Sequence, residues 1–164
     1  MIRVSHRRQS TASAEQLWLA AGKLRLGETS LLGRLIRWRI PGVQSDRSFE
    51  ELFRNPPFTV LAESERSLVS GLVGKIWTLR RDYPPVDAED FQDWSNSGTA
   101  KVVFAHWVEP ADEGRSALHS EGRVKVFGAQ GRLGLASVRP LIRGFEHLVG
   151  SDALAAAVRR AERS

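Results

Sequence analysis

The chain of 164 residues contains no cysteine, one methionine and one tyrosine. Without cysteine it has no disulfide framework, no thiolate metal ligand and no thiol nucleophile. No apolar run approaches the roughly 20 residues of a bilayer-spanning helix, so no stable membrane insertion is expected. Residues 1–8 are charged from the third residue on and lack the apolar core of a signal peptide, so we expect a cytoplasmic protein.

The sequence also lacks the short motifs of several large enzyme classes. It has no His-Glu-x-x-His, no Gly-x-Ser-x-Gly and no Walker loop. Gly128, Gly131 and Gly134 are spaced wrongly for a dinucleotide fingerprint. The motif-bearing enzyme classes therefore lose support, and we expect no cofactor and no metal.

Positive charge is not concentrated anywhere in the chain. Lys and Arg number 24 against 19 Asp and Glu, and the arginines are dispersed. A nucleic-acid binder gathers positive charge on one face and interleaves aromatic residues, so no nucleic-acid partner is expected. The segment 31–39 comes nearest to such a pattern, and an amphipathic helix with a solvated basic face is favoured there over a membrane-surface or nucleic-acid role.

Composition and length indicate one soluble domain over residues 1–164. Hydrophobic residues make up 41% and charged residues 26%, as in globular proteins. A chain of this size buries about two-thirds of its unfolded surface, so a sizeable core is available.

The first third of the chain reads as one strand followed by helices. Alternation predicts a strand over 2–10, and Ser13 with Gln16 has the spacing of a capping box that begins a helix ending by Gly27. A second helix is predicted over 29–39 with Pro41-Gly42 as its stop, and residues 46–54 add a turn of helix.

Strand patterns then dominate until the carboxyl end. A hairpin is predicted from strands 58–63 and 67–73, with 74–79 continuing or following it, and then a short helix capped by Asp87. Two long strands follow over 99–109 and 116–127. The remaining predicted elements are a turn at 128–131, a strand over 132–139 and a helix from Pro140. The apolar stripe changes side at Gly150, so this last helix is either kinked or divided in two.

The two long strands have one apolar and one polar face. The even positions are mostly apolar, which predicts a buried face covered by helix: Val102, Phe104, His106, Val108, Leu118, Ser120, Gly122, Val124 and Val126. The odd positions are mostly polar, with Trp107 as the main exception: Lys101, His119, Glu121, Arg123 and Lys125. The small residues Ser120 and Gly122 leave two alternatives open, tight packing against the helix or a cavity.

The order of elements resembles the helix-grip fold of the START-like superfamily, also called SRPBCC, which includes the major birch pollen allergen and bacterial polyketide cyclases. The resemblance covers most of the chain and is most specific at 73–77, 91–102, 121–124, 138–140 and 154–162, where it is closest to an uncharacterised bacterial subgroup. It implies an α+β fold, with a curved antiparallel sheet of about six or seven strands wrapped around a long C-terminal helix and two short helices after the first strand. It also implies an apolar pocket between sheet and helix. Gly122, where the subgroup often has Thr, and the break at Gly150 depart from the pattern.

The candidate pocket residues follow from the inner phase of the strands together with this resemblance. They are His6, Trp77, Phe91, Trp94, Val102, Phe104, His106, Leu118, Leu141 and Phe145. An imidazole on an apolar face needs a partner, so His6 and His106 bind a ligand, act as bases or hydrogen-bond within the core, and the last is favoured. Core or lid positions are favoured for Trp77, Phe91 and Trp94.

Glu121 and Arg123 lie two residues apart on one strand face. An ion-paired surface ladder is favoured over a catalytic pair. If the phase of the strands were inverted, both residues and Trp107 would line the pocket instead.

Two functions remain, from different classes. The favoured one is the binding of a small hydrophobic ligand, a lipid or a polyketide-like molecule, between the sheet and the C-terminal helix. The alternative is an enzyme similar to polyketide cyclases or aromatases that uses His106, His6 or Tyr83 for proton transfer. A structural role without any ligand is a third reading, preferred if the cavity is smaller than a few water molecules.

Overall fold

The computed structural model describes residues 1–163 apart from 30, 41, 79 and 81, and it leaves the side chains of 145, 146 and 150 undescribed. The predicted helix stop at Pro41 therefore lies outside the described residues. Within the described ranges, no helix is both long enough and apolar enough to cross a bilayer.

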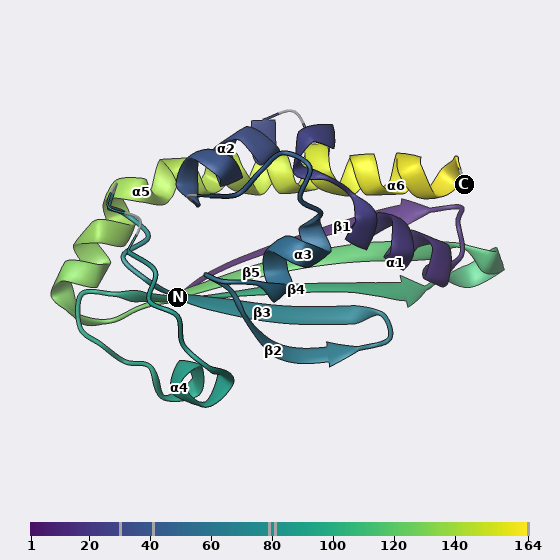
Figure 1. Cartoon of the computed structure of the whole chain (residues 1–164). Helices are drawn as coiled ribbons and strands as arrows, with labels where there is room; N and C mark the ends of the chain where they lie inside the picture. The colour runs from purple at the N-terminus through teal and green to yellow at the C-terminus, as the bar shows by residue number, and fades with distance from the viewer. Residues whose placement is uncertain (30, 41, 79, 81, 164) are drawn as a thin grey trace.

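The described strands form one antiparallel sheet in the order β1-β5-β4-β3-β2. They are β1 (Ile2–Ser10), β2 (Thr59–Ser64), β3 (Ser67–Gly74), β4 (Ala100–Pro110) and β5 (Ser116–Val126). The prediction of six or seven strands is thus corrected to five among the described residues. The α+β class and the long C-terminal helix laid along the sheet are confirmed (Figure 1).

Most helices lie on one face of the sheet (Figure 1). The first part of the chain supplies α1 (Ala14–Lys23), the 3-10 turn η1 (Leu26–Glu28), α2 (Leu31–Arg39) and α3 (Phe49–Arg54). The predicted capping box begins α1, because Ser13 accepts from the Gln16 backbone and Gln16 from that of Ser13. Ser48 and Glu51 repeat this arrangement at α3.

The short helix α4 (Ala88–Asp93) lies apart from the other helices, beside β2 and β3 (Figure 1). Asp87 accepts a hydrogen bond from the Asp90 backbone, which confirms the predicted cap. Phe91 packs over Gly71, whose missing side chain makes room for the ring. A further 3-10 turn, η2 (Asp112–Gly114), joins β4 to β5.

The segment 128–139 was predicted as a turn and a strand, and this prediction is wrong. Helix α5 (Gly128–Leu148) begins at Gly128 and runs through Pro140. The indole of Trp77 lies against Gly134 and Gly131, so the absence of side chains on one face of the helix lets the ring approach closely. Tertiary packing here outweighs the low helix propensity of glycine.

The C-terminal helix is continuous through the predicted break. A π-helical turn, η3 (Val149–Ala153), joins α5 to α6 (Leu154–Glu162). A π turn holds an extra residue, so it shifts the face that the following residues present. The side chains that α6 buries against the rest of the molecule include Leu154, Ala157, Val158 and Ala161.

The even positions of β4 and β5 face the helices, as the alternation predicted. Val102, Val108, Leu118 and Val124 are buried, and they join the α1, α3 and α6 side chains in one apolar cluster. This face, rather than the opposite one, borders the cavity described next.

Candidate ligand cavity

A cavity of about 390 Å³ lies between the inner face of the sheet and the helices α1, α2, α3, α5 and α6. Ligand pockets in proteins commonly have volumes of about 300–1,000 Å³. The volume far exceeds a few water molecules, so the alternative of a solid core does not hold for this face. Its lining is almost entirely aliphatic and aromatic.

The void exists because the centre of β5 carries small side chains. Gly122 lies between Val4 of β1 and Phe104 of β4 in the sheet register, and all three line the cavity. A Cβ atom added at Gly122 would meet no atom within 4 Å. The absent side chain therefore leaves space that no neighbour fills.

Aromatic rings form one wall of the cavity. The ring centroids of Phe53 and Phe58 are 5.0 Å apart, and Phe104 lies 5.5 Å from Phe53 and 5.8 Å from Phe58. Such tilted and edge-on contacts hold the rings in fixed positions. The wall combines residues from α3, from the start of the hairpin and from β4, so it offers a flat ligand a preformed apolar surface.

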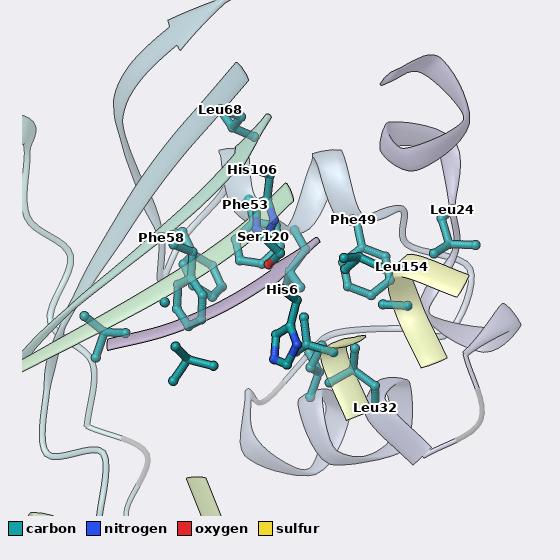
Figure 2. A pocket seen from close by; sticks show the side chains of 18 of the residues that line it. His6, Leu24, Leu32, Phe49, Phe53, Phe58, Leu68, His106, Ser120 and Leu154 are labelled. Carbon is teal, nitrogen blue, oxygen red and sulfur yellow. The ribbon is translucent and has the colours of Figure 1, made fainter. Parts of the chain in front are cut away.

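Three polar side chains cross the inner face of the sheet in one row. His6 on β1 and His106 on β4 both lie opposite Ser120 on β5, which sits between them. The Nε2 atoms of His6 and His106 are buried and have no hydrogen-bond partner. Figure 2 shows the row, with His106 beside Phe53 and His6 directed toward Leu32. Unpartnered buried nitrogen is costly, and a ligand in the cavity would satisfy it.

Burial lowers the pKa of His106 from 6.5 to about 4, because removal from water disfavours the imidazolium. His106 is therefore neutral at pH 7. A neutral imidazole offers one donor and one acceptor nitrogen, so it recognises hydrogen-bonding groups without supplying charge.

Two charged residues among those described line the cavity, and both are engaged at its margin. Arg39 of α2 donates to the carbonyl oxygens of Thr78, at 2.6 Å, and Ile76. Its guanidinium also lies 5.5 Å from the ring centre of Tyr83. Glu50 of α3 is half exposed and pairs with Arg54 at 3.1 Å. Arg39 thus ties α2 to the segment 75–78 at the edge of the cavity.

The structure places six of the ten candidate pocket residues around the cavity: His6, Val102, Phe104, His106, Leu118 and Leu141. Trp77, Phe91 and Trp94 lie elsewhere, because Trp77 packs on α5, Phe91 on Gly71, and Trp94 donates to Thr99 Oγ1 at 3.0 Å. The side chain of Phe145 lies outside the described residues.

Sequence reasoning missed the part of the lining that the early helices supply. These residues include Leu32, Leu35 and Ile36 of α2, Phe49, Leu52 and Phe53 of α3, and Phe58 before β2. Their apolar spacing was visible in the sequence, but it does not tell whether a buried helix face packs against the sheet or borders a void.

The outer face of the sheet carries the residues that an inverted phase would have brought inside. Glu121 pairs with Arg3 at 2.7 Å and with Arg123 at 2.5 Å, which lowers the pKa of its carboxyl. The favoured surface ladder is therefore the arrangement found. The ring of Trp107 stacks on His119 with centroids 4.8 Å apart; His119 reaches the cavity lining, whereas Trp107 is not among the lining residues.

No group of three or more histidine, aspartate or glutamate side chains suited to a metal ion occurs among the described residues. The described lining residues offer a ligand apolar contact, aromatic stacking and hydrogen bonds to the imidazoles.

No protein-family model and no curated protein matches the chain. Solved structures similar to it include norcoclaurine synthase from Thalictrum flavum, at 14% identity over 99% of this chain and 84% of that chain with a TM-score of 0.45. A protein from Thermus thermophilus is 14% identical, with 98% and 97% covered and a TM-score of 0.41. The Zhui aromatase/cyclase from Streptomyces sp. R1128 is 13% identical, with 99% and 94% covered and a TM-score of 0.35. Likeness at this level concerns architecture and carries no conclusion about ligand or reaction.

Proposed function

We propose that this protein binds a small hydrophobic molecule, a lipid or a polyketide-like compound, in the cavity between the sheet and the C-terminal helix. The observation that carries the proposal is the open space above Gly122, at the centre of an apolar cavity of about 390 Å³. In a close-packed core, neighbouring atoms would fill the space above this glycine.

Affinity would come from removing apolar ligand surface from water. Each 100 Å² buried contributes about 2.5 kcal/mol before the costs of association are subtracted. The wall of Phe53, Phe58 and Phe104 is already formed, so little side-chain ordering opposes binding.

Filling the cavity tests the proposal. The probe is N-phenyl-1-naphthylamine, a neutral dye whose fluorescence rises in apolar surroundings. We expect the wild type to bind it, and Gly122→Leu to bind at least about ten-fold more weakly because the leucine occupies the space. Gly144→Leu is the matched control, since a side chain added at Gly144 would also meet no atom within 4 Å, but this residue lies exposed on α5.

Native mass spectrometry of the purified protein, followed by extraction, identifies any ligand that remains bound. Wild type that binds no dye and carries no small molecule would overturn the proposal, as would equal dye binding by Gly122→Leu and Gly144→Leu.

The unpartnered imidazoles favour a second candidate function, that of an enzyme resembling cyclases or aromatases. His6 and His106 flank the same part of the cavity, where either would move a proton to or from a bound polyketide-like chain. Tyr83 at the margin is a further proton-transfer group. His106→Gln separates the candidates, because an enzyme loses turnover while ligand affinity stays, whereas a binding protein shows no turnover before or after the change.

A further inference from the structure

The polar side chains on the sheet side of the cavity are arranged across three neighbouring strands. His6, Ser120 and His106 lie opposite one another, and adjacent strands are about 4.8 Å apart. The two imidazoles therefore lie on either side of Ser120, on strands about 10 Å apart, a distance that a fused ring with two polar substituents can span. Both Nε2 atoms lack a partner within the protein.

Among the described lining residues, no Lys or Arg is free to neutralise an anion beside the two imidazoles. Arg39 is the one Arg or Lys among the described lining residues, and its guanidinium is held by the carbonyl oxygens of Thr78 and Ile76 at the margin. His106 is neutral at pH 7 because burial lowers its pKa to about 4. A carboxylate or phosphate brought to the row would stay buried without a counter-charge, which is strongly unfavourable.

A hydroxyl group fits the row where an ion does not. It both donates and accepts, so it pairs with an imidazole nitrogen in either tautomer. The ring of His106 lies 4.7 Å from that of Phe53, whose other ring neighbours include Phe49, Phe58 and Phe104. Hydrogen-bonding groups thus border a surface on which an aromatic ring stacks.

We propose that the ligand's buried end is a neutral hydroxylated aromatic ring, hydrogen-bonded by His6 and His106 and packed on the Phe53 wall. This inference rests on the proposed function and names the ligand class of the same cavity. It separates phenol-like ligands from fatty acids and phosphate headgroups, whose ionised groups the row does not accept.

Three probes of one ring size test the inference by displacing N-phenyl-1-naphthylamine at pH 7. They are naphthalene, 2-naphthol, which is neutral, and 2-naphthoate, which is ionised. We expect 2-naphthol to compete at least about five-fold better than naphthalene. We expect 2-naphthoate to compete at least about ten-fold worse than 2-naphthol.

Substitution of the imidazoles assigns the effect to these residues. The single hydroxyl of 2-naphthol reaches one of the two imidazoles, so in the double variant His6→Leu/His106→Leu the advantage of 2-naphthol over naphthalene should fall below about two-fold while the dye still binds. His106→Phe keeps a ring beside Phe53 and serves if the leucine variant does not fold. His147→Gln, which changes an exposed histidine of α5 outside the cavity, should keep the full advantage.

The outcomes distinguish the two proposals. Failure of the wild type to bind the dye overturns the proposed function and this inference together. Dye binding with equal displacement by naphthalene and 2-naphthol, or with stronger displacement by 2-naphthoate, overturns only the inference. Persistence of the 2-naphthol advantage in the histidine variants overturns the assignment to His6 and His106.

Discussion

The imidazole ring of His106 lies 4.7 Å from the phenyl ring of Phe53, measured between centroids, and the two planes meet at 49°. The phenyl ring offers the imidazole no hydrogen bond, and Nε2 of His106 has no hydrogen-bond partner among the described residues. A buried polar atom left unsatisfied costs about 1–3 kcal/mol. The inner face of the sheet thus keeps a destabilising group at the point where a ligand would bind.

His106→Phe should therefore stabilise the ligand-free protein. Phenylalanine has nearly the same shape and no polar atom to satisfy, so we expect the free energy of unfolding to rise by about 1 kcal/mol. Urea denaturation at pH 7 measures the change. His147→Phe at an exposed position should alter it by less than about 0.5 kcal/mol. A loss of stability in His106→Phe would mean that the imidazole already has a stabilising partner.

Stability should fall as the pH is lowered from 7 toward 4. Unfolded histidine takes up its proton near pH 6.5 and His106 in the folded protein only near pH 4, so the unfolded state binds more protons between these values. At about 1.4 kcal/mol per pKa unit, this shift is on the order of 3 kcal/mol. The loss of stability is measured from the midpoints of urea denaturation at a series of pH values from 7 to 4.

The contribution of His106 is isolated by comparison with His106→Phe. The other titratable residues lining the cavity are retained in that variant: His6, Arg39, Glu50, Tyr83 and His119. The variant should therefore lose less stability over this pH range than the wild type. Parallel pH profiles for the two proteins would show that His106 does not titrate in the expected way.

Removing Arg39 should speed the exchange of ligand with solvent. Its guanidinium holds the carbonyl oxygens of Ile76 and Thr78 against α2 at the margin of the cavity. We expect Arg39→Ala to raise the dissociation rate of N-phenyl-1-naphthylamine several-fold, as stopped-flow fluorescence would measure. Arg37→Ala, at an exposed position two residues earlier, is the control and should leave the rate unchanged.

Gly134→Ala should disturb the packing of α5 although alanine favours helices. A methyl group at this position would overlap the indole of Trp77, because the added carbon would lie closer to the ring atoms than van der Waals contact allows. We expect a loss of about 1–3 kcal/mol in the free energy of unfolding and a shift in tryptophan fluorescence. Gly144→Ala has open space around it and should be neutral or stabilising. Equal effects at both positions would contradict the observed packing.

The sequence predicted the strands and early helices well where a local signal was strong. Alternation identified β1, β4 and β5, and the capping residues Ser13 and Asp87 marked two helix starts. The start of α5 was missed because Gly128, Gly131 and Gly134 have the composition of a turn. Gly131 and Gly134 face Trp77, more than fifty residues away, and Gly128 packs on Ser97; no local sequence pattern indicates such contacts.

The candidate site was predicted in part for the same reason. Strand phase placed His6 and His106 on the inner face, and register confirms that both lie opposite Ser120. The aromatic wall was missed, since Phe53 and Phe58 gain their role from the way α3 lies over the sheet. The cavity exists because Gly122 has no side chain and no neighbour fills the space. The alternation of apolar and polar residues along a strand does not show such a gap.

The π turn Val149–Ala153 makes the length of the C-terminal helix critical as well as its composition. Asp152 within the turn accepts hydrogen bonds from the backbone of Leu31, at 3.1 Å, and of Leu32, at the first turn of α2. Loss of one residue from this turn would restore an ordinary helix and keep α6 on its present face, whereas loss of a residue from α5 would rotate everything after it by about 100°. Leu154 and Val158 would then leave the core, so this helix tolerates changes of side chain far better than a change in its number of residues.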